Sequence, residues 1–210
     1  MFMQRRMLVT LALFPVPPAI AGLIQFFHPE LPLACVALSI DVLIMYLNWL
    51  DQMISIDPLT RLNNRKQLGY LYEAWQEDLQ EESYLYLMII DANKFKGIND
   101  TYGHIEGDAA LVRIADALVL SCKNFHGRTN IARYGGDEFV ILADVESPEL
   151  VDALQVKIKK TLGELNRAAK SPYELTVSIG MARAEKGIAL KEIIENADEE
   201  MYQQKKLTQK

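Results

Sequence analysis

The sequence contains little cysteine and no excess of basic residues. Its 210 residues include only two cysteines, Cys35 and Cys122, and 28 acidic residues outnumber the 22 Lys and Arg residues. Two widely separated thiols exclude a disulfide framework and favour a reducing compartment. The net charge of −6 argues against a protein that coats nucleic acid, because such proteins need a basic face. The sequence has no internal repeat, and a chain of this length can bury a core of its own.

The first fifty residues are almost free of charge. They hold two basic and two acidic residues, so the whole net charge lies in the rest of the chain. Two apolar stretches, 7–27 and 31–50, each have about 20 residues, which is the length of a helix that spans a ~30 Å hydrocarbon layer. We predict a transmembrane helical hairpin in residues 1–50, in contact with lipid at the cell membrane. Basic residues before and after the pair predict that the remainder of the chain is cytoplasmic.

Other interpretations of this region stay open. Residues 1–21 also fit a cleavable signal peptide, and the two stretches could instead form a buried hairpin of a soluble protein. Asp41 is either a sensor inside the membrane or a carboxyl that is neutral or paired with a neighbouring helix. Apolar residues at spacings of four, three and four are typical of a dimerising coiled coil, although a lipid-facing stripe has the same pattern. These residues are Leu43, Leu47, Leu50 and Ile54.

The remainder of the chain alternates between helical and strand patterns. We interpret residues 51–57 as a signalling linker, and Asp57 can cap a helix whose first residue is Pro58. The alternation from 58 to 210 indicates an α+β or α/β-type layer structure, with a central sheet flanked by helices. The expected helices are 58–80, 107–123, 148–169 and 187–206, and the expected strands are 84–90, 131–134, 138–143 and 174–181.

Acidic residues mark the ends of two of these strands. Asp91 follows the apolar run 84–90, and Asp137 and Glu138 follow the glycine pair that joins two strands. A glycine pair suits a hairpin that needs positive φ angles, and a lone carboxylate at a strand end is often only a cap. Adjacent carboxylates repel each other unless a cation neutralises them. Together with Asp91 they predict a pocket of three carboxylates for Mg²⁺, a hard cation that suits a nucleoside triphosphate.

The segment 91–108 offers groups that could bind such a nucleotide. Backbone N–H groups after Asp91, with Lys96 beside them, could hold phosphates. Asn99 and Asp108 supply the donors and acceptors that recognise a guanine edge. Taken singly, each of these residues is more simply a loop, capping or surface residue.

Five motifs in register carry a resemblance to the GGDEF domain of diguanylate cyclases, over about residues 55–206. The motifs are Asp57-Pro58-Leu59-Thr60-Arg61-Leu62-Asn63-Asn64-Arg65, the 91–108 segment, Arg133-Tyr134-Gly135-Gly136-Asp137-Glu138-Phe139, Val177-Ser178-Ile179-Gly180 and Ala197-Asp198-Glu199-Glu200-Met201-Tyr202. The resemblance implies the palm fold of nucleotidyl cyclases. It also implies a homodimer that condenses two GTP into cyclic di-GMP and releases two pyrophosphates.

The resemblance also implies roles for single residues. Asp91, the carbonyl of Ala92 and Asp137 would bind Mg²⁺, with Mn²⁺ as the alternative ion. Glu138 would bind the metal or act as the base on the ribose 3′-hydroxyl, and the choice of base between Asp137 and Glu138 stays open. The substrate-binding residues would be Asn99, His104 and Asp108 at the guanine and Phe95, Lys96 and Lys205 at the phosphates.

The sequence departs from the family pattern at three places. Asn93 replaces an aspartate of the strand-end motif, and His126 and Thr129 replace the Arg and Asp of the inhibitory product site, which makes feedback inhibition there doubtful. Thr208-Gln209 replaces a Gly-Arg pair after the last helix. Two alternative functions remain: an inactive module that binds GTP or cyclic di-GMP, and a cyclase that makes another dinucleotide. The sensed signal could enter through an upstream partner.

Overall fold

The computed structural model describes residues 14–53, 55–79 and 83–208, and the chain divides into two compact units, Met1–Ile54 and Ser55–Lys210. In the first unit, helix α2 (Val16–Phe27) packs against helix α3 (Leu33–Met53). The side chain of Gln25 accepts a hydrogen bond of 2.9 Å from the backbone N–H of Ala34, which joins the two helices near their connection.

The predicted transmembrane hairpin is wrong for these helices. Within the described ranges, no helix combines the length and the apolar character that crossing a membrane requires. The 12 residues of α2 rise only about 18 Å, against a hydrocarbon layer of ~30 Å, and α3 carries the carboxyl of Asp41 among its apolar residues. Residues 7–13 of the first stretch and Ile54 of the apolar stripe lie outside the described residues.

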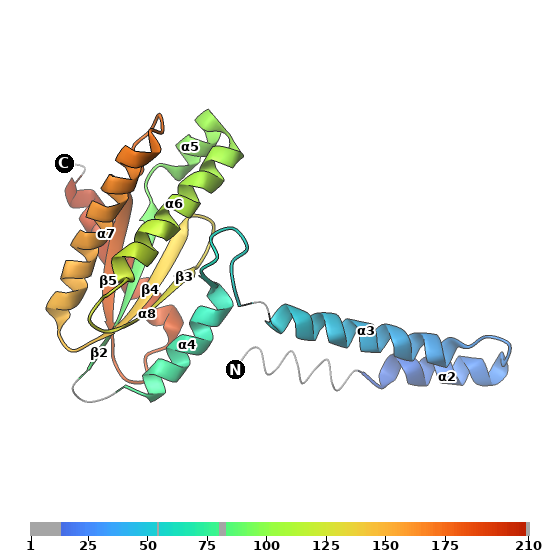
Figure 1. Ribbon diagram of the computed structural model, residues 1–210. Coiled ribbons are helices and arrows are strands. Elements are labelled where there is room, and N and C mark those ends of the chain that lie inside the picture. The colour runs from blue at the N-terminus through green and yellow to red at the C-terminus, as the bar shows by residue number, and fades with distance from the viewer. Residues whose placement is uncertain (1–13, 54, 80–82, 209–210) are drawn as a thin grey trace. The chain divides into compact units, whose positions relative to one another are not determined.

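The second unit is built on a five-stranded mixed sheet with the order β1-β3-β4-β2-β5 (Figure 1). Only β1 and β3 are parallel, and the other neighbours pair in antiparallel register. Strand β2, which lies between β4 and β5, is apolar along nearly its whole length, as expected for a strand that is covered on both faces. The strands are β1 (Asn63–Asn64), β2 (Tyr84–Ala92), β3 (Arg128–Arg133), β4 (Glu138–Val145) and β5 (Val177–Ala184).

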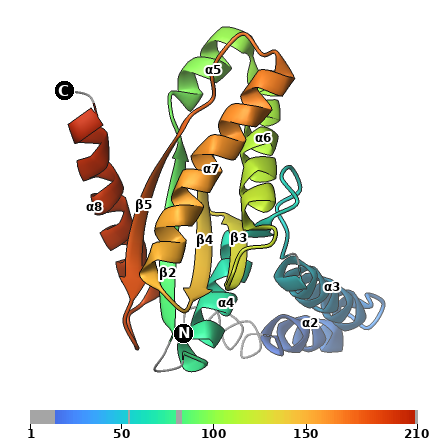
Figure 2. The ribbon, with the colours of Figure 1, turned by 60° about the vertical axis from the view of Figure 1, so that its left-hand side comes forward.

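Helices cover both faces of this sheet (Figure 2). Helices α6 and α7 pack on the face that carries Met88 and Ile90. Helices α4 and α8 pack on the opposite face, where Leu87 and Ile89 are buried. The predicted central sheet flanked by helices is therefore confirmed. The helices of this unit are α4 (Arg65–Glu77), α5 (Phe95–Tyr102), α6 (His104–Cys122), α7 (Pro148–Ala169) and α8 (Leu190–Thr208).

The start of this unit differs from the prediction. The carboxylate of Asp57 accepts hydrogen bonds of 2.8 Å from both the N–H and the hydroxyl of Thr60, which closes a turn instead of capping a helix. Arg61 then takes a left-handed conformation with φ of 60°. Helix α4 begins at Arg65, and Asn64 is its cap. Helix α5 was not predicted, because its eight residues are too few to show a clear apolar period.

Candidate active site

Two acidic residues stand opposite each other where β2 and β4 meet. Asp91, near the end of β2, pairs in register with Glu138, the first residue of β4. Directly opposed residues of an antiparallel pair lie on the same face of the sheet. The N–H of Ala92 also donates a 3.3 Å hydrogen bond to the carbonyl of Asp137. The structure thus places the tip of the β3–β4 hairpin beside the end of β2, as the sequence predicts.

Only Gly135 of the hairpin's glycine pair is needed for space, and neither glycine is needed for its backbone angles. Neither Gly135 nor Gly136 has a positive φ, so the sequence prediction on this point is wrong. A Cβ atom on Gly135 would lie 2.9 Å from the carboxylate oxygen Oε2 of Glu138. A Cβ atom on Gly136 would meet nothing within 4 Å. Gly135 therefore leaves room for the Glu138 carboxylate, which folds back over the turn.

The surroundings of Glu138 carry an excess of negative charge. Burial raises the pKa of Glu138, and repulsion from Asp91, Asp137 and Asp198 raises it further. Arg65, whose guanidinium lies 4.5 Å from the centre of the Tyr134 ring, works in the opposite direction and lowers this pKa. A site with this charge balance attracts cations.

Lys205 brings a cation to this site from the last helix. Its ammonium donates a hydrogen bond of 2.7 Å to the Oδ1 atom of Asp91, and both side chains are partly buried. Strand alternation places Asp91 and Glu138 on the face that α4 and α8 cover. The first turn of α4 and the last turns of α8 therefore reach the two carboxylates.

The predicted pocket of three carboxylates would consist of Asp91, Asp137 and Glu138. No group of three or more His, Cys, Asp or Glu residues in the described part of the chain is arranged to hold a metal ion. Asp137 precedes Glu138, the residue that pairs with Asp91, and Lys205 holds the Asp91 carboxylate in an ion pair. Carboxylate oxygens are the hard donors that a divalent cation such as Mg²⁺ prefers. The ammonium of Lys205 at Asp91 shows that a positive charge is accommodated beside this carboxylate.

The residues predicted to recognise guanine meet where α5 joins α6. A Cβ atom on Gly107 would overlap the amide oxygen of Asn99 and lie 2.9 Å from its Cγ atom. The Asn99 amide on α5 thus rests on the backbone of α6, one residue before Asp108. The side chains of His104 and Asp108 are exposed nearby on the first turns of α6. Phe95 packs partly into the core at the start of α5, and Lys96 is exposed beside it.

Comparison with known proteins decides the family. The family model "Diguanylate cyclase, GGDEF domain" matches residues 54–210. The chain belongs to the GGDEF diguanylate cyclase family.

Relatives of known name agree with this assignment. Diguanylate cyclase DgcZ of Escherichia coli is 33% identical over 156 residues, which cover 72% of this chain and 50% of the relative. The first four curated relatives are matched over only 20% to 50% of their own length.

Two solved structures share the fold. The coiled coil and GGDEF domain of DgcB from Caulobacter crescentus, in complex with c-di-GMP, is 26% identical, with a TM-score of 0.65 over 83% of this chain and 92% of that chain. Diguanylate cyclase SiaD from Pseudomonas aeruginosa, in complex with its activator SiaC, is 26% identical, with a TM-score of 0.64 over 88% of this chain and 73% of that chain.

The GGDEF domain uses the neutral Asn93 to fix the turn after β2. Its amide donates to the hydroxyl of Thr176 at 3.1 Å, and its oxygen accepts from the hydroxyl of Ser178 at 2.7 Å. An aspartate could accept the second bond but could not donate the first. The amide therefore joins the turn to β5 without adding a further negative charge near Asp91.

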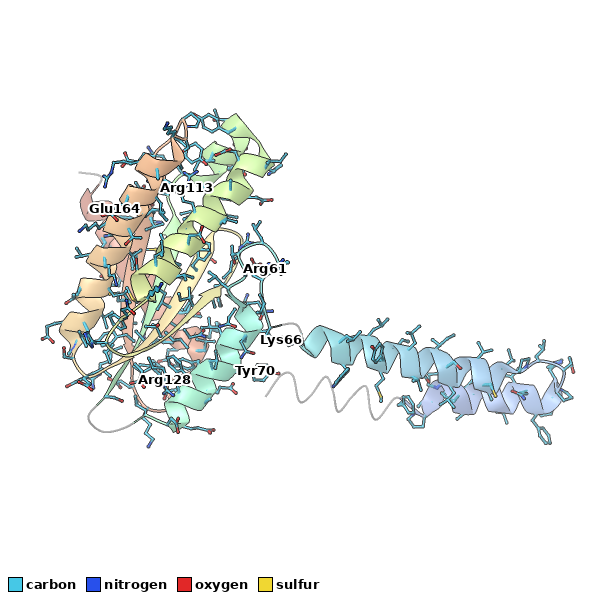
Figure 3. The ribbon with its side chains drawn as sticks, viewed as in Figure 1. Arg61, Lys66, Tyr70, Arg113, Arg128 and Glu164 are labelled. Carbon is cyan, nitrogen blue, oxygen red and sulfur yellow. The ribbon has the colours of Figure 1, made fainter. Side chains whose placement is uncertain are left out.

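In the GGDEF domain, Arg128 contacts other side chains of the domain, close in sequence to the two departures from the family's product-site motif. Arg128 lies between His126 and Thr129, and Figure 3 labels it beside α4. Its guanidinium lies 4.2 Å from the ring centre of Trp75 and 3.1 Å from the carboxylate of Asp144. The guanidinium of Arg128 therefore already has an aromatic and an acidic partner within the domain.

Sequence reasoning missed three residues of this GGDEF site. Arg133 donates to both carboxylate oxygens of Asp57 and to the carbonyl of Gly136, so it holds the hairpin from behind. Arg65 and Asp198 act on Glu138 through their charges. A usable signal existed for Asp198, because it precedes Lys205 by seven residues, which places both on one side of a helix.

Proposed function

We propose that this chain is an active diguanylate cyclase that joins two GTP molecules into cyclic di-GMP. The observation that carries the proposal is the opposition of Asp91 and Glu138, with Lys205 beside them. Two phosphodiester bonds form, each between the 3′-oxygen of one GTP and the α-phosphorus of the other. Two pyrophosphates leave, and each 3′-hydroxyl gives up its proton.

The chain's own residues bind and orient the nucleotide. Asn99 and Asp108 hold the guanine edge, with His104 beside them, because an amide and a carboxylate together match its donors and acceptors. The backbone at Phe95 and Lys96 faces the phosphates at the start of α5. Orientation of this kind lowers the barrier by fixing the reacting atoms at short range.

Glu138 is the base in this proposal. Its raised pKa makes Glu138 a stronger proton acceptor than an ordinary glutamate. Its place as the first residue of β4 attaches it to the backbone of the sheet. Asp137, which lies in the turn before β4, is assigned to the metal with Asp91 and the carbonyl of Ala92. When bound there, Mg²⁺ would neutralise phosphate charge and lower the pKa of the 3′-hydroxyl.

The product requires two chains. Each site is proposed to bind one GTP, so the two linkages of the product form only when two GGDEF domains face each other as a homodimer. Such an arrangement predicts that the rate per chain rises with protein concentration. Residues 58–210 carry the catalytic part in this assignment.

A turnover assay tests the proposal. The full chain is incubated with GTP and Mg²⁺ over a range of protein concentrations, and pyrophosphate release and product mass are measured. We expect cyclic di-GMP with two pyrophosphates for each product, and no product from the Glu138→Gln variant, although this variant should still bind GTP.

Each alternative function has its own outcome in this assay. Binding of GTP without product at every protein concentration would show an inactive binding module. An adenine-containing product from a mixture of ATP and GTP would show a different dinucleotide cyclase. Either outcome contradicts the proposal.

A further inference from the structure

The contact between Lys205 and Asp91 occupies the residue that the proposed function needs for its metal. The Nζ–Oδ1 distance is 2.7 Å, and the exposed fractions of the two side chains are 30% and 24%. A charge-assisted hydrogen bond of this length in a partly buried site is a strong one. Asp91 therefore has a cationic partner within the chain itself.

The cation is one that can leave. A lysine ammonium is a point charge on a flexible four-carbon stem, so it can move several ångströms without any movement of its helix. The bond fixes no planar geometry, unlike the paired bonds of an arginine. The same stem that reaches Asp91 can therefore turn toward a phosphate at the end of β2.

The helix that carries Lys205 is held firmly. Strand β5 is at the edge of the sheet, and the N–H of Met181 on this strand donates to Glu200 of α8 at 2.9 Å. Gln204 donates in turn to the same carboxylate. Gly180 also lies so close to α8 that a Cβ atom there would be 2.6 Å from the Cβ atom of Met201. These contacts hold the segment of α8 just before Lys205 against β5.

We propose that Lys205 is an exchangeable counter-cation. It neutralises Asp91 while the site is empty, and it passes to the phosphates of the nucleotide when a divalent cation takes Asp91. The proposal rests on the proposed function for the identity of the nucleotide. Its consequence is cooperative binding: the metal frees the lysine that the nucleotide needs, and the nucleotide draws away the lysine that competes with the metal. Linkage requires this effect to be equal in both directions.

The test measures binding of Mn²⁺ alone to the full chain, with free Mn²⁺ followed by electron paramagnetic resonance. We expect the Lys205→Gln variant to bind Mn²⁺ about tenfold more tightly than the unchanged chain, because the competing cation is gone. The Lys206→Gln variant is the matched control, since Lys206 is exposed and lies over the Tyr202 ring, and it should bind like the unchanged chain. The Lys205→Arg variant keeps the positive charge, and it should bind Mn²⁺ as weakly as the unchanged chain does.

A second titration adds a non-hydrolysable GTP analogue. The analogue should tighten Mn²⁺ binding to the unchanged chain about tenfold, and this gain should be largely lost in Lys205→Gln. Equal or weaker binding of Mn²⁺ alone by Lys205→Gln than by the unchanged chain overturns the proposal, as does an unchanged gain from the analogue. The result is independent of turnover: a chain that shows the exchange but makes no cyclic di-GMP contradicts only the proposed function.

Discussion

Arg133 and Asp57 form a paired contact that joins the beginning of the GGDEF domain to its signature hairpin. One guanidinium nitrogen of Arg133 lies 3.2 Å from each carboxylate oxygen of Asp57, and only 17% of each side chain is exposed. The same guanidinium donates to the carbonyl of Gly136 at 2.7 and 3.1 Å. The turn that follows the linker and the hairpin that carries Glu138 are thus held by one side chain.

Removal of either partner of this contact should destabilise the domain. Asp57→Asn and Arg133→Gln should each lower the free energy of unfolding by about 1–3 kcal/mol, because each leaves a partly buried charge without its partner. The double variant should lose less than the sum of the two. Urea unfolding measures these values, with Lys191→Ala as the control, since the Lys191–Glu195 pair is exposed and should change stability by less than about 0.5 kcal/mol.

The contact also predicts a pH dependence. Burial tends to raise the pKa of Asp57, but hydrogen bonds from Thr60 and Arg133 outweigh burial and hold this pKa below 3.8. A lowered folded-state pKa contributes stability above pH 3.8, and that stability is lost as the pH falls through the folded-state value. The stability difference between the unchanged chain and Asp57→Asn should therefore shrink below about pH 4. A constant difference between pH 7 and pH 3 would contradict this assignment.

Gly135→Ala should impair the reaction more than the fold. The new Cβ atom would lie 2.9 Å from Oε2 of Glu138, and the flexible carboxylate can give way only by leaving its position. We expect kcat to fall about 10- to 100-fold while the unfolding midpoint changes little. Gly136→Ala is the matched control, because its Cβ atom meets nothing within 4 Å. Equal kcat values for the two variants would show that the position of the Glu138 carboxylate does not matter.

Gly107→Ala should weaken nucleotide binding. Its Cβ atom would occupy the place of the Asn99 amide and force that amide to move. Calorimetry with a non-hydrolysable GTP analogue should show about a tenfold loss of affinity, which is the scale of one or two lost hydrogen bonds. Gly97→Ala serves as the control, since it lies on the same helix as Asn99 and its Cβ atom would have open space. The guanine assignment fails if both variants bind the analogue like the unchanged chain.

Glu138→Gln should stabilise the metal-free domain near neutral pH. Burial and the neighbouring carboxylates raise the pKa of Glu138 above 4.5, so the stability of the unchanged chain falls as the pH rises from 4.5 through the raised folded-state value. The amide removes this repulsion, and the melting temperature at pH 7 should rise by about 2–4 °C.

Melting temperatures at a second pH distinguish the loss of charge repulsion in Glu138→Gln from a general gain in packing. At pH 4, where Glu138 is largely protonated in both the folded and the unfolded state, the two proteins should melt alike. Thermal unfolding in the presence of a chelator measures both values, and the exposed Glu195→Gln should show no such dependence on pH. An equal gain at pH 4 would contradict the electrostatic explanation.

The sequence by itself determined the elements that have a clear period, and it determined the family. The apolar run of β2 and the helix Pro148–Ala169 follow directly from their patterns, because each buries a continuous apolar surface. Local chemistry also placed acidic residues at the strand ends. The short helix α5 was missed, because eight residues show too little apolar periodicity. The turn at Asp57 was missed, because an aspartate side chain can either cap a helix or close a turn.

Only the tertiary structure decided which charges meet. Asp91 faces Glu138 because of the antiparallel register, and it meets Lys205 because α8 returns to the same face of the sheet. Neither relationship is written in a local pattern, since both join residues far apart in the chain. The structure also showed that Gly135 is needed for the Glu138 carboxylate and that the N-terminal helices do not meet the demands of a membrane span. A side chain's neighbours across a sheet depend on the register of whole strands, and no single segment contains that information.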